Sequence, residues 1–203
     1  MGSYKPLNSR MTMETILTLL IGIGLSAACG FRVFVPLLVL SIASNAGHLN
    51  LATGFEWIGS TPALIAFALA TVLEIAAYYV PWVDNLMDTI AGPAAVVAGT
   101  MLTASLMTDV SPFVKWTLAV IAGGGVAGVV KGSTAVTRGA STLTTGGLGN
   151  PVIATIELGS SIVTSLLAIV IPVVAILVVA LLIFLFSKVL FRRPARSQIP
   201  DPA

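Results

Sequence analysis

Charged residues are scarce in this chain of 203 residues: Asp, Glu, Lys and Arg make up 9% of it, while apolar residues make up 57%. A soluble domain usually carries about 25% charged residues, which keep its surface in contact with water. The mean hydropathy of +1.03 agrees with this shortage. The composition therefore excludes an ordinary soluble fold and predicts a protein embedded in a bilayer.

Cysteine and histidine are each present once, as Cys29 and His48. A single cysteine excludes an internal disulfide and a cysteine-rich metal site, and a single histidine excludes a histidine cluster. A catalytic triad would have to be centred on His48, which lies in a predicted loop where a surface histidine is the simpler interpretation. We therefore predict no catalytic residue, no metal and no cofactor, and we do not expect an enzyme.

The small excess of basic residues, a formal net charge of +2, lies mostly in the two tails of the chain. The tails contain Lys5, Arg10, Lys188, Arg192, Arg193 and Arg196. Basic residues beside membrane spans indicate orientation and contact with anionic lipid before they indicate nucleic acid. We predict the lipid bilayer as a partner, and no nucleic acid.

The apolar runs predict an all-α fold, a polytopic helical membrane protein with about six transmembrane segments. We divide the chain into a cytoplasmic N-terminal arm (1–13), a single helical transmembrane domain (14–191) and a basic cytoplasmic tail (192–203). The apolar runs cover about residues 16–46, 62–80, 92–108, 113–131 and 152–191. Residues 132–150, rich in Gly, Ser and Thr, are predicted to form a loop.

The first and last runs are too long to be single straight crossings. As one helix the first run would measure about 45 Å, against a hydrocarbon core of about 30 Å. Gly30, the charge of Arg32 and Pro36 predict a broken helix with a kink or unwound turn over Gly30–Pro36. The last run is about twice as long as a bilayer requires, and Pro172 at its midpoint predicts either a tight hairpin or one long kinked helix.

The distribution of basic residues favours the hairpin. If the chain start, residues 131–138 and the C-terminal tail all lie in the cytoplasm, the chain needs six crossings. Both termini are then cytoplasmic, and the loop 47–61, which has no Lys or Arg, lies outside.

Small residues recur every four positions in two of the predicted spans. This spacing lets helix backbones approach closely within a membrane, and it fits internal packing and homo-oligomer formation equally well. The residues are Gly22, Ser26 and Gly30 in the first span, and Gly124, Gly128 and Gly132 in the fourth.

Arg32 and Glu74 are ionisable residues within apolar runs. A central arginine costs about 2.5–3.5 kcal/mol on insertion scales, so we expect Arg32 to face protein or water. It is either an anion-binding or gating residue, a structural clamp, or a side chain that reaches an interface. Glu74 is either a carboxylate that responds to protons or cations, the ionic partner of Arg32, or an interfacial residue near the aromatic belt of Tyr78.

Three polar residues, Asp84, Asn85 and Asp88, follow the second span. The two aspartates share one face if this segment is helical, where they bind a cation or simply cap and solvate the segment. Their spacing matches no specific metal motif.

The segment 146–151 is rich in glycine and begins the last run, with Asn150 as a predicted N-cap and Pro151 as the first helical residue. Backbone donors in such a turn can bind an anion, although the Lys-Ser/Thr of a phosphate loop is absent, and a closely packed turn is the simpler alternative. Glu157 starts a polar stripe that we expect to face a cavity or a neighbouring helix.

Three motifs in order carry a family resemblance: residues 25–36 (LSAACGFRVFVP), 80–88 (VPWVDNLMD) and 146–151 (GGLGNP). On these motifs the chain resembles a bacterial membrane family known as domain of unknown function 4126, over about residues 14–191. The resemblance implies a multi-pass protein of the bacterial inner (plasma) membrane, and it carries no activity over. Cys29 stands where the resemblance implies a small residue such as Ala, which argues against an essential thiol.

Our leading functional hypothesis is a small transporter or channel-like protein for an ion or a small anionic solute. Its pathway would contain Arg32, Asp84, Asn85, Asp88, Asn150 and Glu157, with Glu74 as a further polar candidate. The alternative is a non-transporting membrane scaffold or accessory subunit. A third hypothesis, an intramembrane enzyme acting on lipid, lacks a complete acid–base pair.

Overall fold

A computed structural model describes residues 9–108 and 110–190, without the side chains of residues 9–12, 81–82, 84–85, 182, 185–187 and 189–190. Every regular element in this part of the chain is a helix, which confirms the predicted all-α class. Five segments are long and apolar enough to cross a membrane, and two shorter apolar helices accompany them. The elements are α1 (Ser9–Phe31), α2 (Phe34–Asn45), η1 (Glu56–Gly59), α3 (Thr61–Tyr78), α4 (Pro81–Leu106), α5 (Pro112–Leu118), η2 (Ala119–Gly124), α6 (Gly125–Thr145), α7 (Asn150–Val170) and α8 (Pro172–Leu190).

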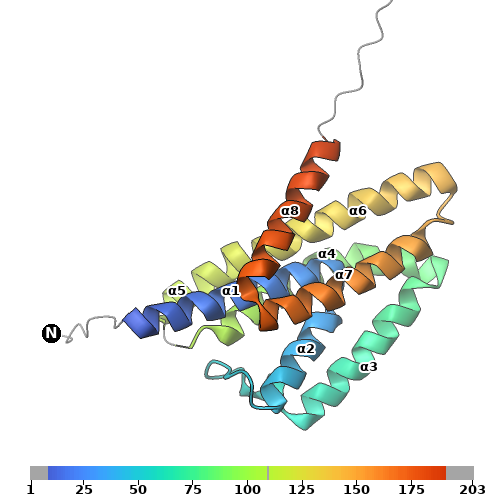
Figure 1. Ribbon diagram of the computed structural model, residues 1–203. Helices are drawn as coiled ribbons and strands as arrows, with labels where there is room; N and C mark the ends of the chain where they lie inside the picture. The colour runs from blue at the N-terminus through green and yellow to red at the C-terminus, as the bar shows by residue number, and fades with distance from the viewer. Residues whose placement is uncertain (1–8, 109, 191–203) are drawn as a thin grey trace, which may run out of the picture.

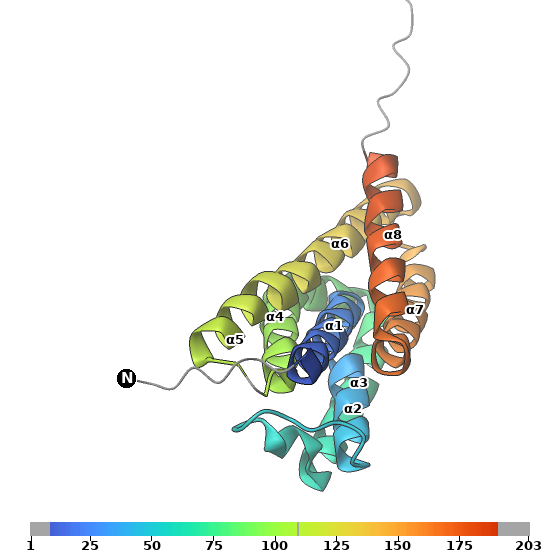
Figure 2. The same ribbon diagram turned by 60° about the vertical axis from the view of Figure 1, so that its left-hand side comes forward.

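Helix α1 occupies the centre of the molecule. Helices α4, α6, α7 and α8 pack around it, while α2 and α3 form an arm that diverges from the bundle (Figures 1 and 2). The core at this centre consists of Leu25 and Cys29 of α1 together with Leu102, Ala127 and Ala168 from three surrounding helices. This arrangement buries the end of α1 at Arg32 from all sides.

The predicted break in the first helix lies at Arg32–Val33, between α1 and α2. Pro36 falls in the first turn of α2, where a missing N–H costs no hydrogen bond. Gly22 of α1 packs against Thr103 near the end of α4, and Ala52 after α2 donates to the carbonyl of Ser105 at 2.7 Å. The start of α1 and the loop after α2 therefore lie at the same end of the molecule, so the two helices form a hairpin and not the single broken crossing that we predicted.

The last apolar run is divided at Ile171, as the hairpin prediction requires. The turn needs no polar side chain because its backbone groups are paired: Ile171 N–H donates to Leu167, and the Ile171 carbonyl accepts from Ala175. Helix α8 then runs in the same direction as α1, since Ala175 lies beside Gly24 and Ile183 packs near Phe31.

The loop predicted at 132–150 is wrong over most of its length, because α6 continues to Thr145. Its Ser and Thr hydroxyls donate to backbone carbonyls one turn earlier, as Ser133 does to Val129 at 2.9 Å, so polar side chains do not interrupt a membrane helix. Only the segment 146–149 turns, with Gly146 and Gly147 in the left-handed region at φ 62° and 89°. Residues 112–145 thus form one continuous apolar segment that includes the π-helical η2.

Candidate functional site

Arg32 is buried at the break between α1 and α2, with a residue exposure of 1%. Its Nη2 donates to the carbonyl of Ala154 in α7 at 2.8 Å. Its Cζ lies 3.7 Å from the centre of the Tyr78 ring, a stacking distance for a guanidinium. Its Nε and Nη1 have no hydrogen-bond partner among the described residues.

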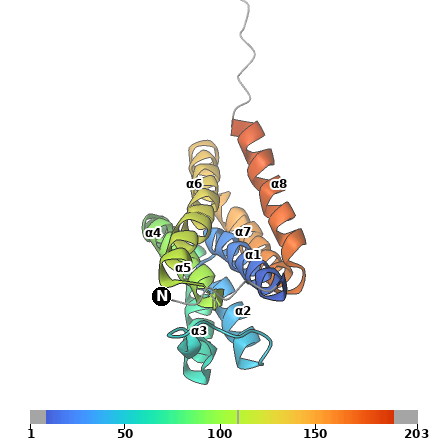
Figure 3. The same cartoon turned by 90° about the vertical axis from the view of Figure 1, so that its left-hand side faces the viewer.

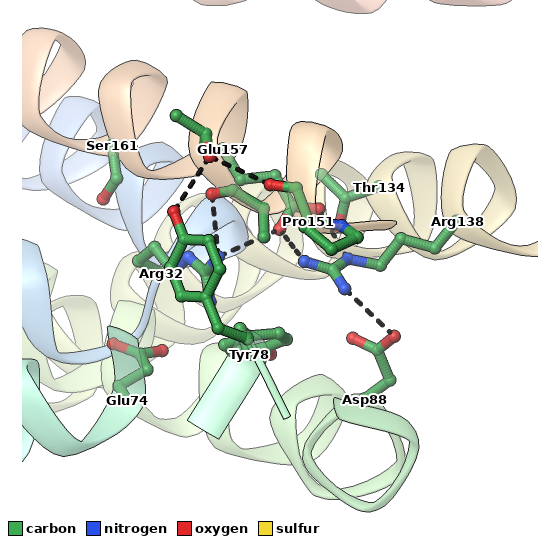
Figure 4. A network of polar contacts seen from close by, with 12 residues as sticks. Arg32, Glu74, Tyr78, Asp88, Thr134, Arg138, Pro151, Glu157 and Ser161 are labelled. Carbon is green, nitrogen blue, oxygen red and sulfur yellow. Dashed lines mark hydrogen bonds and ion pairs between the residues drawn. The ribbon is translucent and has the colours of Figure 1, made fainter. Parts of the chain in front are cut away.

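Arg138 and Glu157 form the closest ion pair of the site (Figure 4). Arg138 Nε donates to Glu157 Oε1 at 3.0 Å and Nη2 to Oε2 at 2.5 Å, a two-pronged contact that fits the planar guanidinium. Glu157 Oε2 is also 3.7 Å from Arg32 Nη2. Glu157 therefore forms ion pairs with two arginines, and the pair with Arg138 is the shorter one.

Asp88 and Lys131 extend this network toward the surface. Lys131 Nζ lies 3.3 Å from Asp88 Oδ1 and 3.5 Å from the Tyr78 hydroxyl, and Arg138 Nη1 lies 3.7 Å from Asp88 Oδ2. The Asp88 side chain is 24% exposed, whereas the basic side chains are nearly buried. We call Arg32, Tyr78, Asp88, Lys131, Arg138 and Glu157 the Tyr78 cluster.

Glu74 borders the cluster but has a different contact. Its two carboxylate oxygens accept from the backbone N–H groups of Val33 at 2.8 Å and Phe34 at 3.1 Å. These backbone donors at the start of α2 are otherwise unpaired. Glu74, which belongs to α3, therefore caps a helix other than its own. The residue is 4% exposed, which removes the interfacial alternative.

The charges within the Tyr78 cluster are unequal. Its basic members are Arg32, Lys131 and Arg138, and its carboxylates are Asp88 and Glu157. Glu74 adds a third carboxylate beside the cluster, although both its oxygens accept from α2 and no ion pair joins it to Arg32 among the described residues. The formal charges are then equal, and what distinguishes Arg32 is that two of its guanidinium nitrogens have no acceptor in the described part of the chain.

A family model matches residues 19–192, and its description is domain of unknown function (DUF4126). The chain belongs to the DUF4126 family. No curated protein and no solved structure gives a significant match. The match begins within α1 and extends past the end of α8, so it includes the whole Tyr78 cluster of this DUF4126 chain.

In this DUF4126 chain Arg32 from the α1–α2 break meets Glu157 of α7, and Arg138 links Glu157 to Asp88 of α4, with Glu74 beside them. Asn150 lies farther out, where its Nδ2 donates to Thr142 Oγ1 at 3.3 Å. The N-cap of α7 is Gly149 and makes no side-chain bond, so the predicted N-cap role of Asn150 is wrong. The side chains of Asp84 and Asn85 lie outside the described part of the structure.

Sequence reasoning missed Tyr78, Lys131 and Arg138 as members of the site. Tyr78 was predicted in an interfacial belt but is 2% exposed, and the two basic residues were predicted in a cytoplasmic loop. A signal was present: Lys131 and Arg138 are seven residues apart, which places both on one face of a helix. The assumption of a loop concealed it.

The small residues of the predicted packing faces lie at helix contacts, with one exception. Gly22 lies against Thr103, and the Ser26 hydroxyl donates to the Gly99 carbonyl at 2.6 Å. The remaining residues lie as follows: Gly30 against Val130 and Ala127, Gly124 against Thr100 and Val96, Gly128 against Val96, and Gly132 with open space around it.

Proposed function

We propose that this DUF4126 protein is a small transporter or channel-like protein for a small anion, which binds at Arg32. The observation that carries the proposal is the pair of guanidinium nitrogens, Nε and Nη1, without an acceptor in a residue that is 1% exposed. A buried donor left unpaired costs about 1–3 kcal/mol, and more when it is charged. An anion at Arg32 would accept from these two nitrogens and so remove that cost.

The backbone around Arg32 supports transport over static binding. Many transporters place their substrate site where helices are interrupted, because free backbone groups and charges can meet there away from lipid. Here α1 stops at Phe31, α2 restarts at Phe34 under the Glu74 cap, and η2 adds a π-helical segment before α6. Asp88, partly exposed, marks the side on which the cluster meets the surface.

Flux into liposomes tests the proposal. Protein reconstituted into anion-free vesicles is given gradients of chloride, phosphate or acetate, and uptake is followed with and without a membrane potential. We expect uptake of at least one anion, and a loss of at least about tenfold in Arg32→Gln with partial recovery in Arg32→Lys. Lys115→Gln is the matched control, because Lys115 lies in α5, outside the cluster.

Folding of each variant is checked by its thermal unfolding midpoint. Absence of flux for every anion in folded, correctly inserted wild-type protein contradicts the proposal. So does equal flux in wild type and in a folded Arg32→Gln variant. If that variant does not fold, the readout becomes anion-dependent thermal stabilisation of the wild type, whose absence for all three anions also overturns it.

The scaffold alternative has one observation in its favour. Gly125, Gly132 and Gly139 of α6, at seven-residue spacing, have no atom within 4 Å of the position of an added Cβ. A row of small residues on an open helix face suits packing against another membrane helix. A scaffold function predicts that one partner protein co-purifies with the wild type and is lost in Gly132→Leu. It also predicts no anion flux in the wild type or in the variant.

We also propose the bacterial inner membrane as the location, with the C-terminal tail in the cytoplasm. The sequence predicts both termini there. The common direction of α1 and α8 favours opposite sides, because α8 then ends away from the start of α1. The C-terminal segment has more basic residues than the N-terminal one, so it is the better candidate for the cytoplasmic side.

A further inference from the structure

A second site lies beside the Tyr78 cluster, in a partly open cavity of about 230 Å³ between α6, α7 and α8. Figure 3 shows α6 and α8 on either side of α1, with α7 between them. Phe31 and Ile153 line this cavity along with Val179 and Ile183 of α8. One water needs only about 10–15 Å³ of such space, so the cavity has room for part of a larger molecule.

Three of the four hydroxyl groups on the polar wall of the cavity already use their hydrogens. Ser133, Thr134 and Thr137 donate to the carbonyls of Val129, Lys131 and Ser133, at 2.9, 3.0 and 3.0 Å, so their oxygens are left to accept. The fourth hydroxyl, that of Ser160, can still donate. With the Glu157 carboxylate, acceptors outnumber donors on this wall, which favours a ligand that donates hydrogen bonds.

Charge narrows the choice of ligand further. The Glu157 carboxylate is already paired with Arg138 and Arg32, so an ammonium group would meet two arginines and gain little from the acid. An anionic group would meet the Glu157 carboxylate and three accepting hydroxyl oxygens, with the Ser160 hydroxyl as the donor. A neutral hydroxyl group has neither disadvantage and can donate to these oxygens.

The apolar side of the cavity indicates what the rest of the ligand is, beyond its hydroxyl group. The apolar lining of Val179 and Ile183 offers no partner for water. Val136 and Leu177 lie one and two residues before the lining residues Thr137 and Val179. They are 51% and 64% exposed, as expected for residues that face acyl chains. A hydrocarbon chain can reach the cavity from the bilayer without leaving an apolar environment.

We propose that this cavity binds one neutral, hydroxyl-bearing amphiphile from the bilayer, of the monoacylglycerol or long-chain alcohol class. Its hydroxyl donates to the Thr137 oxygen, with Thr134 and Glu157 as further acceptors beside it, and its chain lies along Val179 and Ile183. This binding goes beyond anion transport and does not depend on it, because it needs neither a gradient nor the free nitrogens of Arg32.

Four probes with the same chain separate the possibilities: monoolein, methyl oleate, oleic acid and oleylamine. Purified full-length protein in a short-chain detergent is titrated with each, and binding is measured by native mass spectrometry and by the shift in thermal unfolding midpoint. We expect one monoolein per chain, bound at least about tenfold more tightly than methyl oleate, which cannot donate. Equal or tighter binding of any of the other three probes overturns the proposal, as does no binding of monoolein.

Variants of α6 locate the site. Thr137→Val keeps the shape of the side chain but removes the accepting oxygen, and we expect monoolein binding to fall about tenfold. Thr144→Val is the matched control: Thr144 is an exposed residue of the same helix whose hydroxyl also bonds one turn back, at 2.9 Å to Ala140. If the two variants bind monoolein equally, the amphiphile binds elsewhere and the assignment of this cavity is wrong. Anion flux measured on Thr137→Val keeps this result separate from the transport proposal.

Discussion

At the scale of single residues, Tyr78 organises the charges of this protein. The centre of its ring lies 3.7 Å from Arg32 Cζ, 4.6 Å from Arg138 Cζ and 5.7 Å from Lys131 Nζ. The negative face of an aromatic ring attracts cations, and the attraction grows where water is excluded. An aromatic residue thus adds to the compensation that the carboxylates provide for these buried cations.

Replacing Tyr78 tests how much the ring contributes. Tyr78→Phe keeps the ring and loses a long contact from Lys131, so we expect the free energy of unfolding to fall by less than about 1 kcal/mol. Tyr78→Leu removes the stacking of two buried guanidinium groups and should cost about 2 kcal/mol or more. Unfolding titrations in mixed detergent measure both, with Tyr79→Leu as the control because Tyr79 is 46% exposed. If Tyr78→Leu and Tyr79→Leu lower the free energy of unfolding equally, the cation–π contacts of Tyr78 do not contribute to stability.

At the scale of elements, the interrupted pair α1–α2 holds the candidate site. Glycine and other small residues of α1 let α4 and α6 approach closely. Helix α1 ends just before Arg32, and Glu74 of α3 caps the start of the next helix, α2. Gly30 is the narrowest point of this contact. A Cβ there would meet the Val130 side chain and lie 2.8 Å from the carbonyl oxygen of Ala127.

Gly30→Ala should therefore lower the free energy of unfolding by about 1–3 kcal/mol, because α6 must move away from α1. Gly139→Ala is the matched change on α6, where nothing lies within 4 Å. There the gain in helix propensity should stabilise by about 0.5–1 kcal/mol. Thermal unfolding of the two variants gives the comparison, and a stabilising effect of Gly30→Ala would show that the helices are less closely packed than described.

At the scale of the whole molecule, the direction of each helix decides which face its ends reach. In the hairpin of α1 and α2 the short helix α2 returns the chain toward the end at which α1 starts, which the sequence interpretation did not include, and α8 runs in the direction of α1. If α8 crosses the bilayer, the two termini lie on opposite sides. This affects function, because Glu157 of the Tyr78 cluster lines one cavity with Ile183 of α8, while Arg32 follows the end of α1 and not its start.

Reporter fusions at both ends determine the topology. Green fluorescent protein fluoresces only in the cytoplasm and alkaline phosphatase is active only outside it, so we expect a fluorescent C-terminal fusion and an active N-terminal phosphatase fusion. A fusion in the loop after α2 should agree with the N-terminal one, since both lie at one end of the molecule. Opposite results for these two positions would restore the single broken crossing that the sequence predicted.

The sequence alone determined the class of this protein, the break near Arg32 and the division at Pro172. Hydropathy, helix length and proline act locally, and an apolar helix in lipid must satisfy its own backbone whatever surrounds it. Arg32 and Glu157 could be chosen as site residues for a similar reason, because the cost of a charge in an apolar run is visible without neighbours.

Only the tertiary structure decided which charges meet and which way the helices run. Tyr78, Lys131 and Arg138 are ordinary in their local sequence, and they join Arg32 because α6 packs against α1 while α3 packs against α2 and α4. Glu74 caps α2, because α2 begins beside it. Such pairings join residues distant along the chain, and their energies depend on distance and burial, which no local pattern contains.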